Sequence, residues 1–462
     1  MMSEKEDWVE QEMSHLALND ERLNKRAKKI VREMSQHPTG SIPEFSSDYN
    51  AVRGVYNFFA NSQVKVEKIV AAQKAGTIGR IKAGSHRRIL AIQDTTEFNF
   101  NNHPETAGLG LLSNAKSAGF LAHNTLAVSE QGVPLGVLAQ QVWIRDKKQV
   151  GKRHKRAQLP IAQKESYKWL KALDDSSQGM PSDVEIIEVS DRESDIFEYF
   201  THPRPKQVDL LVRATHDRVL LAEPKKLKAT LEASPVQGTI EVEVRKTRKR
   251  VARTAVCQVC FKQVTLKPPP KKTAMSDDLQ PVKVWAVLVQ EPKPPSSEKA
   301  ITWLLLTTLS IPDFETACQI IDFYTKRWVI ERFHFVLKSG AIFEDRQLRQ
   351  FERLHRLLAL SNWVAWRLLW LTYVGRDQPD LPCTVAFDDL EWQTLYAFVN
   401  KTQSLPKQTP SIAQATVWLA KLGGFLARKS DGYPGVKVLW RGWRRLIDII
   451  QSRLFFHPDF VT

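Results

Sequence analysis

The spacing of apolar and polar residues changes along the chain, and each spacing predicts a different kind of element. Apolar residues recur at helical spacing over residues 18–35 and 48–59, and the first of these segments opens with Asn19 and Asp20, a pair that favours a helix N-cap. From residue 88 onward, short apolar runs bounded by turn residues predict strands. Helical spacing returns near residue 318 and continues toward the end of the chain.

Five strands and one helix are predicted between residues 88 and 213. A first strand over residues 88–94 is followed by a hairpin of residues 121–128 and 134–144 around a Gly-containing turn. A helix near residues 164–173 then precedes strands over residues 184–190 and 208–213. Three antiparallel strands, a helix, and then alternating strands and helices is the order of a ribonuclease-H-like α/β core, so we expect that fold class.

The chain beyond residue 213 is longer than such a core needs. Alternation over residues 241–266 and 282–289 predicts an antiparallel β subdomain inserted at about residues 215–300, after which residues 300–308 return to the core. We therefore expect a helical domain over residues 1–70, a catalytic domain over 71–374 that contains the insert, and a helical domain over 375–462.

The last of these domains is rich in tryptophan. Trp392, Trp418, Trp440 and Trp443 lie among apolar residues at helical spacing, after a break that contains Pro and Asp. Such a tail is either additional core or an oligomerisation module, and we favour the second interpretation because interfaces are enriched in aromatic residues.

Composition narrows the class of partner. The formal net charge is +16, which favours a polyanion without separating DNA from RNA or a membrane surface. No run of 18 apolar residues occurs and the first residues are polar, so we expect a cytoplasmic protein without a membrane segment. Only four cysteines are present. Cys257 and Cys260 are three residues apart on a predicted strand, where they face opposite sides, which disfavours a zinc site.

One uninterrupted helix is predicted over residues 318–338, because this stretch has no Pro or Gly. At about 100° per residue, Tyr324, Arg327, Glu331 and Lys338 share an arc of about 60° along about 21 Å of helix. A carboxylate flanked by cations suits a ligand that is both metal-bound and polyanionic, and nucleic acid is the obvious candidate. Charges at these spacings also form ordinary solvated helix faces.

The spacing Tyr-x2-Arg-x3-Glu-x6-Lys resembles the Y-R-E-K signature of bacterial cut-and-paste transposases of the insertion-sequence-four family. In that family the Glu is the last acid of an Asp-Asp-Glu triad, so the resemblance implies two upstream aspartates at strand ends. Asp94 ends the first predicted strand and Asp191 ends the fourth. Asp195 is the rival of Asp191, which we favour because it ends the strand directly and begins a segment that matches the family motif Asp-Arg-Glu-x-Asp.

Asp94, Asp191 and Glu331 are thus the predicted catalytic residues and the predicted metal ligands. Three carboxylates suit two Mg²⁺ ions, for which Mn²⁺ would substitute, and such ions assist in-line phosphodiester chemistry.

Other side chains are predicted to hold DNA. Tyr324, Arg327 and Lys338 would donate to phosphates beside Glu331. The resemblance adds Arg213 as a further phosphate contact. It also implies that Trp303 stacks on a flipped base, although a buried strand Trp is an equally good interpretation of this residue.

The N-terminal segment resembles the domain with which the family grips the transposon end, notably at residues 53–58. The predicted end-binding residues are clustered on two helices, and they are Arg22, Lys25, Arg26, Lys29, Arg53 and Asn57.

The resemblance covers nearly the whole chain and implies a metal-dependent DNA transposase. Its partners would be double-stranded DNA, at transposon ends and target, and a second copy of the chain in a complex of two ends. In a bacterial cell the protein would be associated with the nucleoid when bound to DNA. Two other classes remain open: a metal-dependent nuclease of the same fold, and a non-catalytic DNA-binding regulator derived from a transposase.

Overall fold

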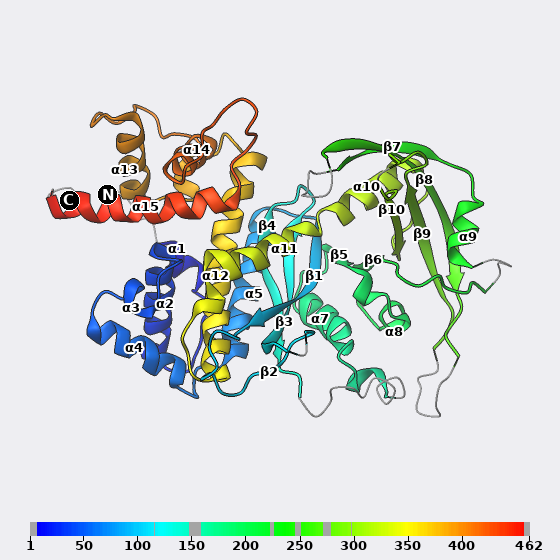
Figure 1. Ribbon diagram of the computed structural model, residues 1–462, viewed down its shortest axis with the longest axis horizontal. Helices are drawn as coiled ribbons and strands as arrows, with labels where there is room; N and C mark the ends of the chain where they lie inside the picture. The colour runs from blue at the N-terminus through cyan, green and yellow to red at the C-terminus, as the bar shows by residue number, and fades with distance from the viewer. Residues whose placement is uncertain are drawn as a thin grey trace.

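The structure is a computed structural model that describes residues 7–114, 116–146, 159–221, 226–244, 251–270, 279–296 and 298–456. Helices gather at one end of the molecule and the strands of the predicted insert at the other, with the central strands between them (Figure 1). The described part is therefore a mixed α/β fold with helical ends, which confirms the broad class expected from the sequence.

A single ten-stranded sheet forms the core, in the order β2-β3-β1-β5-β6-β10-β9-β8-β7, with β4 pairing on β3. The pairs β1–β5 and β5–β6 are parallel, and the others are antiparallel. The strands are β1 (Arg88–Asn99), β2 (Gly110–Leu111), β3 (Ala118–Ser129), β4 (Pro134–Trp143), β5 (Glu185–Ser190), β6 (Val208–Arg213), β7 (Gly238–Val244), β8 (Arg253–Leu266), β9 (Val282–Gln290) and β10 (Thr302–Thr307).

The predicted insert does not form a sheet of its own. Strand β10 pairs antiparallel with β6, placing Leu305 opposite Arg213, and β9, β8 and β7 then follow edge to edge. The strands of the predicted insert, β7, β8 and β9, pair antiparallel, and these hydrogen bonds make them an extension of the central sheet. The sequence shows alternation within each strand but not which strand becomes the neighbour of β6.

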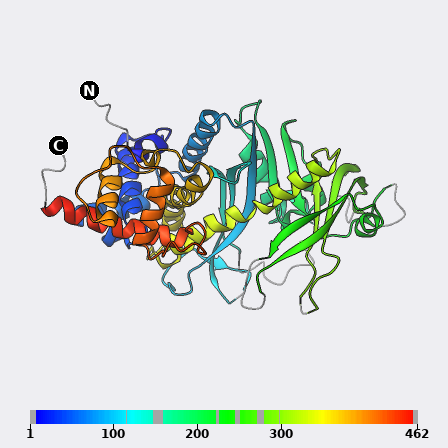
Figure 2. The same ribbon diagram turned by 90° about the horizontal axis from the view of Figure 1, so that it is seen from above.

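Helices cover both faces of the central strands. Helix α11 (Trp328–Phe335) contacts β1 and β3 on one face, and α7 (Tyr167–Ser177) contacts β3 and β4. Successive side chains of β1 point to opposite faces, so Leu90, Ile92 and Asp94 face the α11 side. Helices α10 (Phe314–Thr325) and α11 run across the sheet in both views (Figures 1 and 2).

The segment predicted as one helix is interrupted. Helix α10 ends at Thr325, α11 begins at Trp328, and a π-helical turn, η4 (Val336–Gly340), follows. At the junction the Lys326 amide donates to the carbonyls of both Asp322 and Phe323, and the Arg327 amide donates to Tyr324 at 3.1 Å. These tighter bonds shift the rotation of α11 relative to α10. No Pro or Gly marks the junction, so the break could not be predicted from the residue pattern.

The remaining helices pack at the two termini of the chain. Asp20 and Asp48 accept hydrogen bonds from the first-turn amides of α2 and α4, as expected of N-caps. The N-terminal helices are α1 (Trp8–Glu12), α2 (Glu21–Gln36), α3 (Ile42–Phe45), α4 (Tyr49–Ala60) and α5 (Val66–Ala83). Between the strands lie α8 (Phe197–Thr201) and α9 (Leu227–Glu232), and the C-terminal helices are α12 (Phe351–Asp377), α13 (Asp389–Asn400), α14 (Ile412–Leu422) and α15 (Val436–Phe456).

Helix α12 joins the parts of the molecule. Arg356 donates to the carbonyls of Phe59 at 2.9 Å and Val64 at 3.0 Å, which ties α12 to the end of α4. About three turns of α12 separate this residue from Arg367. The proposed boundaries at residues 70 and 374 both fall inside helices, α5 and α12, so the chain passes between domains without a linker at either point.

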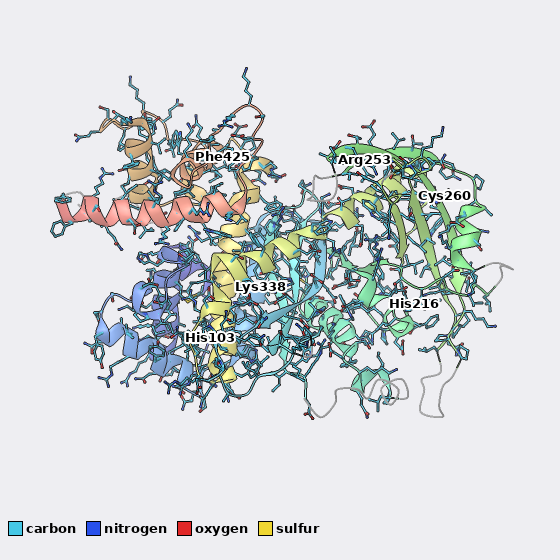
Figure 3. All side chains as sticks on the ribbon, in the orientation of Figure 1. His103, His216, Arg253, Cys260, Lys338 and Phe425 are labelled. Carbon is cyan, nitrogen blue, oxygen red and sulfur yellow. The ribbon has the colours of Figure 1, made fainter. Side chains whose placement is uncertain are left out.

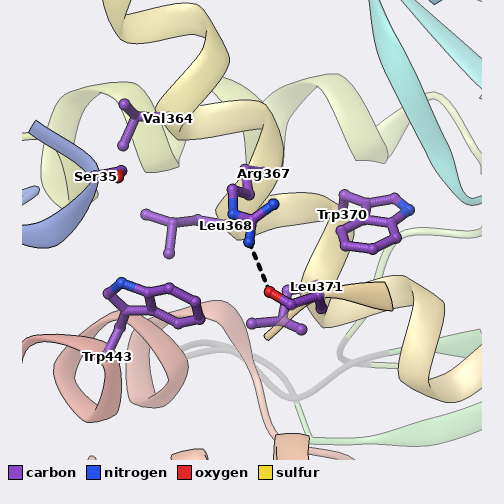
Figure 4. Close-up of a pocket in the computed structure, with 8 residues that line it drawn as sticks. Ser35, Val364, Arg367, Leu368, Trp370, Leu371 and Trp443 are labelled. Carbon is purple, nitrogen blue, oxygen red and sulfur yellow. Dashed lines mark hydrogen bonds between the residues drawn. The ribbon is translucent and has the colours of Figure 1, made fainter. Parts of the chain in front are cut away.

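Arg367 occupies the junction of the N-terminal and C-terminal helices. Its guanidinium donates to the Ala386 carbonyl at 2.6 Å (Figure 4). It also lies 4.4 Å from the centre of the Trp8 ring and 5.9 Å from that of Trp443. A cation held between two indole rings is stabilised by their negative faces. The tryptophan-rich tail therefore supplies core, with Trp392, Trp440 and Trp443 largely buried.

A buried carboxyl lies under the α7 face of the sheet. Glu188 of β5 contacts Ser176 Oγ at 2.5 Å and accepts from Gln93 Nε2 at 2.6 Å. Burial is the main cause that raises the pKa of Glu188 to about 8. The hydroxyl of a protonated Glu188 can donate to Ser176, whose own hydroxyl donates to the Leu173 carbonyl at 3.0 Å. The neutral acid thus fits its site.

We expect Glu188 to make the protein less stable as the pH rises. Its pKa is about 8 in the folded protein and near 4.5 in an unfolded chain, so the folded state binds the extra proton between these values. The free energy of unfolding should fall across this window by up to about 1.4 kcal/mol per pH unit. Glu188→Gln keeps the donor to Ser176 and should remove this slope. Denaturant titrations at pH 5 to 9 measure it, and Glu185→Gln, on the exposed end of β5, is the control.

Candidate active site

The three predicted acids lie on the α11 side of the sheet and at the end of β5. The sequence predicted that Asp94 ends its strand, but Asp94 lies within β1. The pairing of β1 with β5 stops at Ile92, whereas its pairing with β3 continues to Asn99, so Asp94 lies two residues past the point where β5 leaves. The polar residues after Asp94 resemble a turn in the sequence, but they belong to the strand.

Asp191 follows β5 directly and caps a short 3₁₀ helix, η3 (Arg192–Ser194). Its Oδ1 accepts from the Glu193 amide at 2.9 Å, and its side chain is partly exposed. Within the described residues, no hydrogen bond or ion pair engages its second carboxylate oxygen, which is thus available to another ligand.

Asp195, the rival of Asp191, is engaged by the protein itself. Its side chain is 0% exposed and meets Arg218 at 2.5 Å. The other oxygen accepts from the amides of Thr215 at 2.7 Å and His216 at 2.8 Å. All of its principal acceptor positions are thus used in holding the loop after β6, which favours Asp191 as the residue open to a ligand.

Glu331 is in the first turn of α11 and pairs with the residue one turn before it. Its Oε1 accepts from Arg327 Nη2 at 2.7 Å, and 35% of the side chain is exposed. The Nε of Arg327 is buried and has no hydrogen-bond partner within the described residues. The pair therefore presents one free carboxylate oxygen and one free donor at the same place.

The charges of the other two acids affect the pKa of Asp94. Burial and, after it, the charge of Asp191 raise the pKa of Asp94 to about 7, while Arg327 opposes the shift. Glu331 also contributes to the raised pKa. Acids from β1, the end of β5 and α11 therefore influence one another across the site.

His334 was not singled out in the sequence, although it lies one helical turn after Glu331. Its Nδ1 is 3.7 Å from Asp94 Oδ2, and its Nε2 is 3.0 Å from Asn124 Nδ2. Burial, with the charge of Lys338, lowers the pKa of His334 to about 3. The spacing of three from Glu331 was the available signal, since residues three apart share a helix face. Asn124 lies opposite Asp94 in the β1–β3 ladder, which no local pattern reveals.

The residues predicted to bind phosphate differ in their positions and in how deeply they are buried. Lys338 lies in η4, half-buried above the Phe98 ring at 5.5 Å (Figure 3). Arg213, at the end of β6, reaches the Thr302 carbonyl at 3.4 Å. Tyr324 is largely buried in the last turn of α10.

Trp303 lies beside Tyr324, with ring centres 6.2 Å apart. Its strand, β10, pairs with β6 and β9, and β5 and β6 separate it from β1. Strand β10 is therefore not a neighbour of the strand that carries Asp94. Trp303 is only partly buried, so one part of its ring is open beside the Tyr324 side chain.

The cations of α2 divide into two groups, and the first lies outside the predicted end-binding set. Lys28 and Arg32 pair with Glu10 and Asp7 and so fasten α2 to α1. Arg22 and Lys25, by contrast, are exposed on α2 and form no ion pair within the described residues.

Helix α4 continues this surface. Arg53 and Asn57 are exposed one turn apart, and Lys29 lies 3.6 Å from Glu33. Arg26 reaches across to Gly54, where an added Cβ would come within 2.5 Å of the guanidinium. The glycine thus allows the two helices to present their cations together.

Replacing Arg22 and Lys25 with Ala should reduce the salt dependence of DNA-end binding. Each lost phosphate contact lowers the slope of log K against log salt by about 0.9, so we expect a decrease of up to about 1.8. Gel shifts at several salt concentrations measure the slope. Replacing Lys228 on α9 and Lys421 on α14, both exposed, removes the same charge elsewhere and is the control. An unchanged slope in the α2 variant would show that this surface does not meet phosphate.

Within the described residues, no group of three His, Cys, Asp or Glu side chains is already close enough to hold a metal ion. None of the described helices is both long and apolar enough to cross a membrane. Cys257 and Cys260 are buried on β8 with free thiols.

Two family models match the ends of the chain. One, described as transposase DNA-binding, matches residues 5–64, which include α1 to α4. The other, described as the Tn5 transposase dimerisation domain, matches residues 363–455, which run from α12 to α15. A DNA-binding domain before the sheet and a dimerisation domain after it together indicate a DNA transposase of the Tn5 type that binds DNA and forms homodimers.

Proposed function

We propose that the chain is a metal-dependent transposase of the insertion-sequence-four family, Y-R-E-K subgroup, with Asp94, Asp191 and Glu331 as its catalytic acids. The observation that carries this proposal is the electrostatic influence of Asp191 and Glu331 on Asp94, in the part of the chain between the two matched transposase domains. The strand order β4-β3-β1-β5-β6, antiparallel and then parallel, supports a ribonuclease-H-like core around them.

The donor set fits divalent cations. Asp191 and Glu331 each keep an oxygen that no described side chain occupies, and the pKa of Asp94 is raised first by its burial and then by the charge of Asp191. Asp94, Asp191 and Glu331 would hold Mg²⁺, or Mn²⁺ in its place. Two such ions supply activation of the attacking oxygen and stabilisation of the leaving oxygen.

The chain's own donors would position the DNA. The unpartnered Nε of Arg327, together with Lys338 and Arg213, supports contacts to phosphates near the bond that is cut. Tyr324 is largely buried, and its contact with a phosphate would be made through its hydroxyl, the donor of its side chain.

The proposed reaction begins with a nick at the transposon end, in which water attacks phosphorus and a 3′-hydroxyl is released. That hydroxyl then attacks the opposite strand, forming a hairpin and freeing the flanking DNA. Water opens the hairpin, and the restored 3′-hydroxyl attacks target DNA. Each step exchanges one P–O bond for another, so one set of acids and phosphate-binding residues serves all four.

Hairpin formation requires a base to leave the stack, which costs a few kcal/mol. Trp303, partly open beside Tyr324, could receive that base and recover about 1–3 kcal/mol. In Trp303→Ala we expect nearly normal nicking and hairpin formation slowed by about ten- to a hundred-fold. Equal slowing of both steps would identify Trp303 as a purely structural residue.

A strand-transfer assay tests the proposed function. Full-length protein, labelled precut transposon ends and a plasmid target are incubated with Mg²⁺, and joined products are counted. Joining supports a transposase. Cleavage of uncut ends without joining would instead identify a nuclease of the same fold, and binding without cleavage would identify a regulator derived from a transposase.

A further inference from the structure

We propose that His334 is a positioning residue for Asp94, and that a chain of buried side-chain amides fixes which nitrogen of His334 carries the proton. The inference rests on the proposed function in taking Asp94 as a metal ligand. The chain of amides is nevertheless visible in the structure without reference to any reaction.

The chain begins at a backbone carbonyl. Gln73 Nε2, on α5, donates to the Ala359 carbonyl of α12 at 2.6 Å. A carbonyl can only accept, so the Gln73 amide must present its NH₂ group to it and its oxygen to the other side. That oxygen accepts from Asn362 Nδ2 at 3.2 Å. The orientation of the first two amides is therefore fixed by the backbone.

The same order of donors and acceptors continues through Gln140 of β4. Asn362 Oδ1 accepts from Gln140 Nε2 at 3.2 Å, and the same Nε2 donates to Asn124 Oδ1 at 2.8 Å. If Gln140 were turned over, its oxygen would face two other oxygens. Gln140 Oε1 has no partner within the described residues, so nothing opposes the orientation in which Nε2 makes both bonds.

The chain ends at the imidazole of His334. Because Asn124 Oδ1 accepts from Gln140, Asn124 Nδ2 faces His334 Nε2, at 3.0 Å. A donor on that side requires an unprotonated Nε2, so the neutral ring must carry its hydrogen on Nδ1. Gln73, Asn362, Asn124 and His334 are all buried, which shields the order of donors from competing water.

This tautomer has a consequence for the acid. Nδ1 lies 3.7 Å from Asp94 Oδ2, longer than a hydrogen bond, and so presents the positive end of an N–H dipole to one carboxylate oxygen. The other tautomer would present a lone pair and repel it. The N–H holds Oδ2 on the α11 side and leaves Oδ1 for a metal ion, as outer partners orient metal-binding carboxylates elsewhere.

The tautomer is measured directly in metal-free, full-length protein by ¹⁵N NMR of the histidine rings, with the His334 signals assigned by their loss in His334→Gln. We expect an Nδ1–H ring. In Asn362→Leu, which does not touch His334, Gln140 and Asn124 can turn over together, and the Nε2–H form should become populated. Ser361→Ala is the matched control, because Ser361 is buried next to Asn362 but donates only to the Leu357 carbonyl of its own helix. An Nε2–H ring in the wild type, or no change in Asn362→Leu, would overturn the proposal.

Two variants of His334 test its effect on Asp94. Asn places an N–H near the position of Nδ1, whereas Gln preserves a group near Nε2 and more of the side-chain volume. We expect Mn²⁺, added alone to full-length protein and followed by calorimetry, to bind about 10- to 100-fold more weakly to His334→Gln. It should bind His334→Asn within about threefold of wild type. A residue that merely fills space would give the opposite order.

The outcomes separate the two proposals. Tight Mn²⁺ binding and normal strand transfer in His334→Gln would overturn the role of His334 and leave the proposed function standing. A wild type that neither binds Mn²⁺ nor cleaves DNA would overturn the proposed function, and the role of His334 toward a metal ligand with it.

Discussion

Asp191→Asn should lower the rate of DNA cleavage by about 10³-fold or more. Its affinity for a transposon end and its thermal stability should remain close to those of the wild type. The substitution removes one negative charge and leaves the oxygen that caps η3, which accepts from the Glu193 amide. Because the other oxygen meets no described side chain, the folded structure loses little. Nicking of a labelled end in Mg²⁺, beside gel shifts and thermal unfolding of the same preparation, measures all three quantities.

Asp195→Asn is the matched control, four residues away, and should behave in the opposite way. Arg218 would lose its buried partner, and breaking such a pair costs about 3–5 kcal/mol. We expect a large fall in the free energy of unfolding with cleavage retained at temperatures where the variant is folded. Cleavage lost in folded Asp195→Asn and retained in Asp191→Asn would reverse the assignment of the second acid.

Truncation after Asp377 should abolish complexes that contain two transposon ends. It removes α13, α14 and α15, which pack on the end of α12 within the matched dimerisation domain. Binding of a single end should persist, because the N-terminal helices are anchored to α12 at Arg356, well before the cut. Gel shifts with two ends of different lengths, and light scattering of the complexes, distinguish the species.

The control for this truncation is the retained affinity for one end, which reports that the rest of the chain is folded. Removal of α13 to α15 uncovers Leu371 and Val374, so a soluble, single-end complex is the state to be isolated. A truncated chain that still holds two ends would place the contact between copies elsewhere in the molecule.

The sequence predicted the order of the central strands because each has its own apolar run and its own turn residues. It misplaced the end of β1 because Thr95, Thr96 and Glu97 are polar, although they pair with His123, Ala122 and Leu121 of β3. Where the end of a strand depends on pairing with a segment distant in sequence, it cannot be predicted from the neighbouring residues. The neighbours of β10 were unpredictable for the same reason.

In the candidate site, too, contacts within one helix could be predicted from the sequence, and contacts between distant segments could not. Glu331 and Arg327 could be placed together from helical spacing alone, and they do pair. The choice between Asp191 and Asp195 needed Arg218, a residue 23 positions away whose contact with Asp195 no motif contains. Asn124 likewise enters the site through strand register, so only the folded chain shows that it lies opposite Asp94.

Helix α12 has a consequence for where DNA would be cut. It spans 27 residues, or about 40 Å, and contacts α2 and α4 of the N-terminal helices as well as β4 and α11 in the region that carries the acids. A rigid rod with both attachments acts as a ruler between the surface that would recognise a transposon end and the acids that would cut it. The position of the cut is then set by the length of the protein and not by the bases at the cut.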